Sequence, residues 1–483
     1  MKTSELVAII PGAKAAGAER EFISVVSDSK KILPGHAFIA LAGSVTDGHL
    51  YIKDALEAGA EVVLCNRGRG EEVSRATIVE VQDTKEALGI LLPILYPCAG
   101  NIPLIGITGT NGKTTITYLM ESVLFSSGKN PGVIGTINMR YADKTIPSSI
   151  TTPGPVELFQ GLEEMVRAGV DICIMEVSSH ALDQDRTAGL MFDYAVFTNL
   201  SQDHLDYHKD MEAYFQAKEK LFTHYLKGPA VINIDDPYGQ KIASKLNNPI
   251  TYGWNNGAMF RATSLEHTPD GLQVTLTTPQ GASVLRSSLI GDINVYNILA
   301  TVALSHAMGI KMHSVINGIG SMKKVPGRME KVRNPYGLTI IVDYAHTPAA
   351  LRTALESARS LAGGRLITVF GCGGDRDQGK RPLMGKIASD LSDIVIITSD
   401  NPRSEDPLSI IEEILKGIPS RANILVEPDR KKAIALGVTS MNHDDCLMIA
   451  GKGHEDYQII GKQRLPFDDR LCAEQSLMEV CNR

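Results

Sequence analysis

The chain has 483 residues, of which 43% are hydrophobic and 21% charged, and its net charge is −7. This length predicts about three domains. The negative charge excludes an overall basic field for nucleic acid, and no apolar run approaches the roughly 18 residues of a membrane-spanning helix. Seven cysteines without a C-x-x-C pair favour reduced thiols, and the apolar stretch 6–10 is too short for a secretory signal. We therefore expect a cytoplasmic enzyme.

Residues 1–98 are predicted to form a first α/β domain. Residues 37–41 and 62–64 are expected strands, with a helix at 51–58 between them. Small hydroxylated residues stand on the turns around the first strand, at Ser29 before it and at Ser44 and Thr46 after it. They could contact a polar ligand, but turns and helix caps favour the same residue types. The prolines that follow at 97 and 103 indicate a domain boundary.

The second predicted domain, residues 99–328, opens on a candidate phosphate loop. A short apolar strand at 104–107 leads into the glycine-rich segment 109–115, and apolar residues then recur at helical spacing. Such a turn aims backbone N–H groups and a helix dipole at one point. Lys113 could neutralise phosphate oxygens and the Thr114 hydroxyl could bind Mg²⁺. The general pattern has glycine where this chain has Ile107, so the match is partial. The segment predicts nucleotide binding.

The same domain continues as alternating strands and helices. Strands are expected at 132–135, 171–176 and 194–200, and a helix at 155–168. This pattern predicts a doubly wound parallel sheet, whose ligands bind beyond the carboxyl ends of the strands.

Acidic and imidazole groups follow two of these strand ends. Glu176 closes one strand, and His204 and His208 follow another. The two histidines have the spacing of a zinc pair, but neighbouring aspartates favour Mg²⁺; a solvated loop is the alternative. Lys218 is expected to be an exposed lysine on a helix.

Residues 329–483 are predicted to form a third α/β domain. Its expected strands each end in polar residues, and lie at 338–342, 366–370, 394–398 and 446–450. The glycine-rich segment 371–376 has Arg376 in place of the third glycine of G-x-G-x-x-G, which disfavours a dinucleotide site. Arg376 and Arg403 suit paired N–H bonds to a carboxylate, although such arginines are more often surface ion-pair partners.

A series of motifs, in this order, resembles the Mur ligase family along nearly the whole chain. The motifs occupy residues 109–115, 175–180, 198–206, 291–297, 326–330, 343–348, 400–403 and 451–455. The family shows the same departure at Ile107. The resemblance implies a three-domain α/β fold: an N-terminal uridine-binding domain, a central ATP-binding sheet and a Rossmann-like C-terminal domain that binds an amino acid.

The resemblance also implies an activity in cytoplasmic peptidoglycan precursor synthesis. ATP would phosphorylate the D-glutamyl carboxylate of UDP-N-acetylmuramoyl-L-alanyl-D-glutamate, and the amine of meso-diaminopimelate would attack the acyl phosphate. The implied partners are these small molecules and Mg²⁺, with no nucleic acid and no membrane span, and the protein is expected to be a monomer.

Roles for individual residues are implied in the same way. The catalytic residues would be Lys113, Glu176, His204 and Lys218. The magnesium site would use Thr114, Glu176, His204 and Lys218, the last carrying a carbamate derived from CO₂. ATP would contact Gly109, Thr110, Asn111, Gly112, Lys113, Thr114, Asn294, Arg328 and Asp343. The UDP-linked substrate would contact Ser29, Ser44, Val45, Thr46, Thr151, Thr152, Ser178, Gln184 and Arg186. Diaminopimelate would contact Arg376, Asp400, Asn401, Pro402, Arg403, Gly451 and Glu455.

Three alternatives stay open at this stage. A ligase that adds L-lysine would not need a cation for a second carboxylate, the task expected of Arg403. A folylpolyglutamate synthase would share the ATP-binding half and differ in the first domain. A nucleotide-switched binding protein would hydrolyse ATP slowly and would not need a second polar pocket at Arg376, Arg403 and Glu455.

Overall fold

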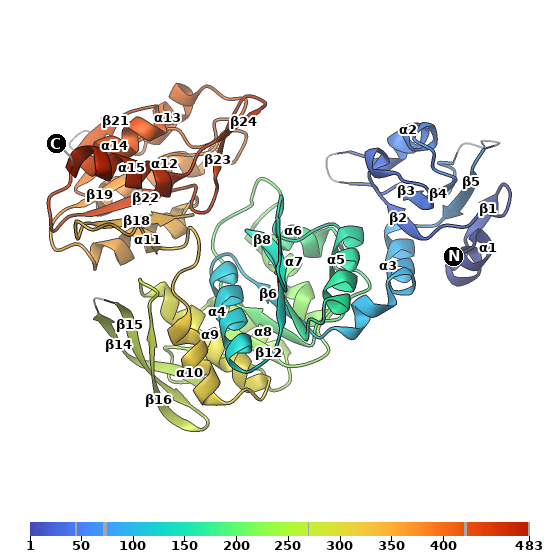
Figure 1. The fold of residues 1–483 in the computed structure, drawn as a ribbon, viewed down its shortest axis with the longest axis horizontal. Helices are drawn as coiled ribbons and strands as arrows, with labels where there is room; N and C mark the ends of the chain where they lie inside the picture. The colour runs from blue at the N-terminus through green and yellow to red at the C-terminus, as the bar shows by residue number, and fades with distance from the viewer. Residues whose placement is uncertain (44–45, 71–74, 269, 420–422, 482–483) are drawn as a thin grey trace. The chain divides into compact units, whose positions relative to one another are not determined.

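The computed structural model describes residues 1–43, 46–70, 75–268, 270–419 and 423–481. These residues form two compact α/β units (Figure 1). Unit 1 comprises residues 1–108, 129–195 and 217–229, and unit 2 comprises residues 109–128, 196–216 and 230–483. Ser44 and Val45, both expected to contact the UDP-linked substrate, lie outside the described residues. The division into domains at residues 98 and 328 stays a prediction.

Unit 1 begins with a sheet of strands that run parallel except at one edge. The strand order is β1 (Lys14–Ala16), β5 (Thr77–Val81), β4 (Val62–Asn66), β3 (His36–Ile39) and β2 (Ser24–Val26), with β1 antiparallel to β5. The accompanying helices are α1 (Thr3–Ile9), η1 (Ser29–Lys31), η2 (Gly48–Tyr51), α2 (Ile52–Glu57), α3 (Thr84–Leu95) and η3 (Pro97–Asn101). Alternate sheet residues such as Phe38 and Val63 pack with Ile52 and Ala55 of α2. The predicted strands and helix are confirmed, although the helix begins as a 3₁₀ turn.

A second run of neighbouring strands in unit 1 includes the strand that precedes the phosphate loop. Its order is β6 (Leu104–Thr108), β10 (Ile172–Glu176), β7 (Pro131–Ile134), β8 (Asn138–Tyr141) and β9 (Lys144–Pro147). The first three are parallel and the last two form an antiparallel extension. Helices α5 (Pro155–Arg167) and α6 (Ser179–Asp183) complete this part. The chain passes from one unit to the other within β11 (Tyr194–Phe197) and α7 (Met211–Thr223).

Unit 2 opens with α4 (Lys113–Ser126), the helix after the phosphate loop. Its predicted apolar face is confirmed, because Ile116, Leu119, Met120 and Val123 are fully buried. A run of neighbouring strands follows, in the order β12 (Ala230–Asn233), β13 (Ile250–Gly253), β14 (Phe260–Thr268), β15 (Gly271–Thr278) and β16 (Gly281–Ser287). The neighbouring helices are α8 (Pro237–Lys245), α9 (Ile293–Ala307) and α10 (Met312–Ser321).

The C-terminal sheet of unit 2 is parallel apart from one short edge strand. Its order is β17 (Glu330–Lys331), β18 (Thr339–Asp343), β22 (Cys446–Ala450), β19 (Leu366–Phe370), β20 (Ile394–Ile397) and β21 (Ile424–Val426), with β17 antiparallel. The predicted strands are confirmed. Because parallel strands end at one edge of a sheet, the polar residues that follow them gather there.

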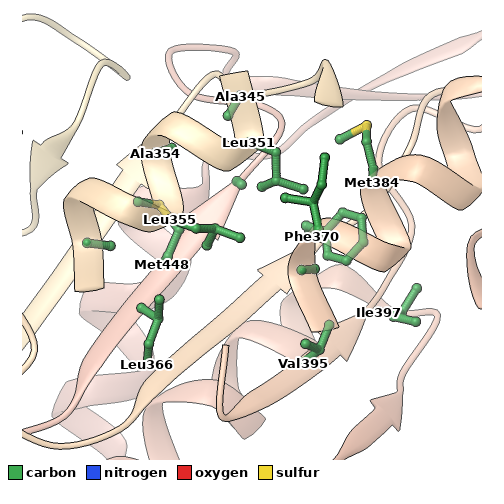
Figure 2. Close-up of a cluster of buried hydrophobic side chains, with 14 of the residues drawn as sticks. Ala345, Leu351, Ala354, Leu355, Leu366, Phe370, Met384, Val395, Ile397 and Met448 are labelled. Atoms are coloured by element: carbon green, nitrogen blue, oxygen red, sulfur yellow. The ribbon is translucent and has the colours of Figure 1, made fainter. Parts of the chain in front are cut away.

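Helices cover both faces of this sheet. One face packs against α11 (Pro348–Arg359), α12 (Lys380–Leu391) and α13 (Pro407–Leu415). Figure 2 shows Leu351 and Leu355 of α11 and Met384 of α12 turned toward Phe370 and the other sheet residues. The other face packs against α14 (Arg430–Thr439) and α15 (Asp469–Cys481). The hairpin of β23 (Tyr457–Ile460) and β24 (Gln463–Pro466) follows β22. Of the helices described, none has the length and apolar character needed to cross a bilayer.

Candidate active site

The segment 109–115 forms a tight loop at the start of α4, as its glycines predicted. Gly109 has φ +144° and Gly112 has φ +92°, backbone conformations that favour glycine. A Cβ at Gly109 would lie 1.8 Å from Thr198 Oγ1, and one at Gly112 would lie 2.5 Å from Asn297 Oδ1. Both positions therefore require glycine on grounds of space as well as conformation.

The end of β11 and the loop's own lysine hold this loop in place. Thr110 N–H donates to the Asn199 carbonyl at 2.8 Å, and Asn111 N–H donates to Asn199 Oδ1 at 3.0 Å. Lys113 Nζ donates to the carbonyls of Gly109 at 2.8 Å and Thr110 at 2.9 Å. The ammonium therefore lies over the centre of the loop, where phosphate oxygens bind in such turns.

A cavity of about 90 Å³ lies beside the loop within unit 2. Five of the residues predicted to contact ATP lie on its wall, namely Asn111, Gly112, Asn294, Arg328 and Asp343. These residues come from the loop, α9, the segment before β17 and the end of β18. The structure thus brings together groups that are far apart in the sequence.

The polar groups on this wall are oriented by their neighbours. Asn294 Nδ2 donates to the Ile290 carbonyl at 2.7 Å, and Asn294 Oδ1 accepts from Asn297 Nδ2 at 2.8 Å. These two bonds fix the direction of the Asn294 amide. The Asn297 side chain, which the sequence analysis did not single out, therefore supports both the glycine loop and Asn294.

Arg328 and Asp343 are oppositely charged residues on the same wall. Arg328 Nη2 donates to Thr114 Oγ1 at 3.2 Å, and the guanidinium carbon lies 4.7 Å from the centre of the Tyr344 ring. Asp343 Oδ2 accepts the N–H of Met329 at 2.7 Å. Burial raises the pKa of the Asp343 carboxyl above its usual range, against the opposing effect of Arg328.

Glu176 ends β10 in unit 1, and its side chain is 1% exposed. Its two carboxylate oxygens accept from Thr136, one from the backbone N–H at 3.0 Å and the other from the hydroxyl at 2.8 Å. The Thr136 hydroxyl also lies 3.0 Å from that of Thr151, and the Thr152 hydroxyl donates to the Glu176 carbonyl at 2.8 Å. Thr136 fixes the carboxylate, a contact that the sequence analysis did not anticipate.

Most of the residues predicted to hold the UDP-linked substrate lie together near Glu176. Ser178 N–H donates to Thr152 Oγ1 at 3.0 Å, Arg186 Nη1 to the Thr152 carbonyl at 2.9 Å, and Arg186 Nε to Gln184 Oε1 at 3.0 Å. A cavity of about 160 Å³ is lined in part by Gln184, Arg186 and Gly43.

Ser29 and Thr46 lie on separate turns of the same unit. Ser29 is buried in η1, which Asp28 caps by accepting from Lys30 N–H at 3.0 Å. The Thr46 hydroxyl donates to Tyr51 Oη at 3.3 Å.

The prediction that Lys218 is exposed is wrong, because this side chain is 1% exposed. It lies on α7 four residues after Tyr214 and three before Leu221, both of which are buried. Residues at these spacings share one face of a helix, so Lys218 belongs to the buried face. The sequence shows the same spacing, but the charge of Lys218 led to the prediction of an exposed side chain.

His204 and His208, the pair considered for a metal, have different environments. His204 is held at φ +54°, and its Nε2 lies 3.4 Å from Asp203 Oδ2. Burial opposes ionisation of Asp203, but His204, His346 and Lys380 hold the pKa of its carboxyl below the usual range. His208 is buried against Tyr207 and Tyr214.

The predicted magnesium residues are divided between the two units. Glu176 and Lys218 belong to unit 1, and Thr114 and His204 to unit 2. Within the described ranges, no three histidine, cysteine, aspartate or glutamate side chains form a group that could hold a metal ion.

The residues predicted to bind diaminopimelate gather at the carboxyl edge of the C-terminal sheet. Arg403 has φ +52°, and its backbone pairs with β23 through bonds to Ile459 at 3.1 Å and Gly461 at 2.7 Å. Arg403 Nη1 donates to the Gly374 carbonyl at 2.7 Å. Arg376 is exposed and donates to the Asp375 carbonyl at 3.2 Å. The half-buried Arg403 is therefore held more firmly than Arg376.

Acidic and amide groups face one another on the other side of this edge. Asn401 Nδ2 donates to Glu455 Oε2 at 2.9 Å, and a Cβ at Gly451 would lie 2.6 Å from Asp400 Oδ2. Pro402 is buried beside them. Lys452, which the sequence analysis did not select, donates to both Asn401 and Glu455. The pocket thus combines an arginine, two carboxylates and an amide.

Comparison with known proteins places this chain in one family. The model of the Mur ligase middle domain matches residues 107–305, that of the Mur ligase glutamate ligase domain matches 327–453, and that of the Mur ligase family catalytic domain matches 21–93. A Geobacter metallireducens protein named UDP-N-acetylmuramoyl-L-alanyl-D-glutamate–2,6-diaminopimelate ligase is 44% identical, over 100% of this chain and 99% of its own. A Thermosynechococcus vestitus protein of the same name is also 44% identical, over 98% and 96%.

A solved structure titled with the same enzyme name has 34% identity and a TM-score of 0.68, and covers 95% of each chain. The three family models together span most of the sequence, and relatives match it from end to end. The chain therefore belongs to the Mur ligase family.

Proposed function

We propose that this protein is an ATP-dependent ligase that joins meso-2,6-diaminopimelate to UDP-N-acetylmuramoyl-L-alanyl-D-glutamate, in peptidoglycan precursor synthesis in the cytoplasm. One observation carries the proposal: relatives named as 2,6-diaminopimelate ligases match the whole chain at 44% identity. The match includes the N-terminal part, in which a folylpolyglutamate synthase would differ. The C-terminal part of the chain contains Arg403, a cation that a second substrate carboxylate would require.

The reaction would proceed in two chemical steps. The D-glutamyl carboxylate attacks the γ-phosphorus of ATP, which releases ADP and leaves an acyl phosphate. The amine of diaminopimelate then attacks the acyl carbon, and inorganic phosphate leaves as the amide forms. Negative charge develops on the transferred phosphoryl group and on the tetrahedral intermediate. Lys113 and the N–H groups at the start of α4 suit the stabilisation of the first of these charges.

ATP would bind at the glycine loop and the cavity beside it. The phosphates would lie at Gly109, Thr110, Asn111, Gly112 and Lys113. Asn294 would contact the adenine, Arg328 a phosphate and Asp343 the ribose. The fixed amide of Asn294 and the half-buried carboxylate of Asp343 provide directional bonding groups for such a ligand.

The Thr114 hydroxyl, the Glu176 carboxylate and His204 would hold Mg²⁺, as suits an ion that prefers oxygen ligands and substrate phosphates. When bound, the ion neutralises charge on the phosphoryl group. The contacts from Thr136 to both Glu176 oxygens keep the buried carboxylate in a single orientation.

Lys218 would act as a carbamate. Its ammonium first loses a proton, and the neutral amine then attacks CO₂ to form an N–C bond and loses a second proton, which converts the cation into a carboxylate. Lys218 lies on the buried face of α7, and a carboxylate at this position would complement a bound cation.

The two remaining substrates would occupy pockets that lie apart from the nucleotide loop in the sequence. Thr151, Thr152, Ser178, Gln184 and Arg186 would contact the muramoyl-dipeptide, and Ser29, Ser44, Val45 and Thr46 the uridine end. Arg403 and Arg376 would bind the distal carboxylate of diaminopimelate, and Glu455 and Asp400 its distal ammonium. Asn401, Pro402 and Gly451 would shape this pocket. We propose a monomer with domains at residues 1–98, 99–328 and 329–483.

A coupled phosphate-release assay tests the function. The purified protein receives ATP, Mg²⁺ and the UDP-dipeptide, together with meso-diaminopimelate, L-lysine or no amino acid. We expect phosphate release that depends on diaminopimelate and a product of the summed mass less water. Preferred use of L-lysine would select the lysine-adding alternative. Turnover with a folate in place of the UDP-dipeptide would select the synthase, and ATP hydrolysis unaffected by any amino acid would favour a nucleotide switch.

A further inference from the structure

Lys452 follows β22 in the pocket assigned to diaminopimelate, and its side chain is 0% exposed. A lysine is almost never fully buried unless its charge is paired. This ammonium has no part in the roles assigned above, although it lies beside three residues expected to contact diaminopimelate, Asp400, Asn401 and Glu455. Its contacts indicate what it does.

The ammonium joins three segments of the chain. Lys452 Nζ donates to Asn401 Oδ1 at 3.1 Å and to Glu455 Oε2 at 3.0 Å. It lies 3.8 Å from Asp400 Oδ1 and 5.4 Å from the centre of the Tyr457 ring. Asp400 and Asn401 follow β20, and Tyr457 begins β23. One buried cation therefore sets the relative positions of two strand ends and the hairpin.

These contacts leave the Asn401 amide a single orientation. Its Oδ1 accepts from Lys452 and from the N–H of Ile459 at 2.9 Å, both of which are groups that only donate. Its Nδ2 therefore points to Glu455 Oε2, at 2.9 Å. If Lys452 were absent, the Asn401 and Glu455 side chains would lose the hydrogen-bond donor that they share.

Lys452 also sets the charge that a ligand meets. Asp400 and Glu455 carry two negative charges against the one positive charge of Lys452, which leaves these three side chains with one net negative charge, apart from the positive Arg403 and Arg376. Arg430 acts on the same two carboxylates, but it is paired with Asp469 at 2.7 Å. The side chains of Asp400 and Glu455 are 9% and 13% exposed, whereas that of Lys452 is 0% exposed. A ligand therefore reaches the carboxylates, with the ammonium behind them.

We infer that Lys452 is a positioning residue that determines the amino-acid selectivity of this pocket. It orients Asn401 and Glu455 and limits the net charge to one negative unit, which suits an amino acid whose far end carries both an ammonium and a carboxylate. A second uncompensated negative charge would repel that carboxylate beside Arg403 and would favour an amino acid that ends in a bare ammonium. This inference rests on the proposed function.

The test compares Lys452→Met with Lys462→Met, the same substitution at an exposed lysine in the turn between β23 and β24. Phosphate release is measured with diaminopimelate and with L-lysine. For Lys452→Met we expect the ratio of kcat/KM for diaminopimelate to that for L-lysine to fall by about tenfold or more. The KM for ATP should stay within about twofold of the parent's value, since the phosphate loop is unchanged. Lys462→Met should match the parent.

An unchanged ratio in Lys452→Met, or an equal fall in kcat/KM with both amino acids, would overturn the inference. Lys452→Arg keeps the charge and should retain the preference for diaminopimelate. If neither variant folds, a crystal structure of the parent with bound diaminopimelate tests the inference instead. Lys452 Nζ bonded to Asn401 and Glu455 supports the inference, and Nζ bonded to a ligand carboxylate overturns it. A parent protein that does not use diaminopimelate would instead refute the proposed function.

Discussion

Replacement of Gly112 by alanine tests whether the loop and the cavity beside it act as one nucleotide site. Gly112 has φ +92°, where a Cβ costs about 1–2 kcal/mol. That Cβ would lie 2.5 Å from Asn297 Oδ1, so the amide would have to move away. Its 2.8 Å bond to Asn294 would then be lost, at about 1 kcal/mol. We expect a total loss of about 2–3 kcal/mol in the free energy of unfolding.

Gly128→Ala, just beyond the other end of α4, is the matched control. Gly128 has φ +80°, and no described atom lies within 4 Å of an added Cβ. This variant should lose only the conformational cost of about 1–2 kcal/mol. Urea unfolding measures both losses, and titration calorimetry with ADP measures binding. We expect Gly112→Ala to bind ADP at least about tenfold more weakly and Gly128→Ala to bind it like the parent. Equal ADP affinities in the two variants would refute the assignment of this cavity.

Three further predictions concern single side chains. Arg403→Ala should raise the KM for diaminopimelate by about 30-fold, since a hydrogen bond to a charged group contributes about 2 kcal/mol, and should leave the KM for ATP unchanged. Arg352→Ala, at an exposed site, is the control. Parent-like diaminopimelate kinetics in Arg403→Ala would contradict the assignment. Lys218→Ala should lose most phosphate release and regain part of it with added acetate, whereas full activity would remove Lys218 from the site. Burial and nearby cations lower the pKa of His454 to about 3 in the folded protein, whereas the pKa is about 6.5 in the unfolded chain. Between these two pH values the unfolded chain therefore binds more protons than the folded protein. The free energy of unfolding of the parent should therefore fall by about 1.5 kcal/mol from pH 6.5 to pH 5. Urea unfolding at the two pH values should show a smaller fall for His454→Gln. Equal falls in the two proteins would exclude His454 as the cause.

Local sequence patterns predicted the architecture because they follow from local geometry. The apolar spacing after the phosphate loop requires only that α4 bury one face, and Ile116 to Val123 do so. The polar residues after β18, β20 and β22 gather because parallel strands end at one edge. The ATP contacts expected of Asn294, Arg328 and Asp343 came from the resemblance to the Mur ligase family rather than from local patterns, and these roles stay predictions.

The contacts that orient these residues could not be predicted from local sequence. Thr136 supports Glu176 and Asn297 supports Asn294, and each contact needs a tertiary structure. Lys452 needs two other segments to meet it. The burial of Lys218 was missed because its charge outweighed its position on the helix. Tertiary packing determines whether a charged side chain is buried, and the usual preference of the residue type is a weak guide to this.

The bonds from Lys113 to the carbonyls of its own loop have a consequence for how tightly a triphosphate binds. A lysine side chain loses up to about 2 kcal/mol of rotamer freedom when it becomes ordered. Here that entropy is lost during folding rather than at the encounter with the ligand. Under the proposed function, the arriving phosphates would meet a cation that is already immobilised, so more of their attraction to it would remain as affinity.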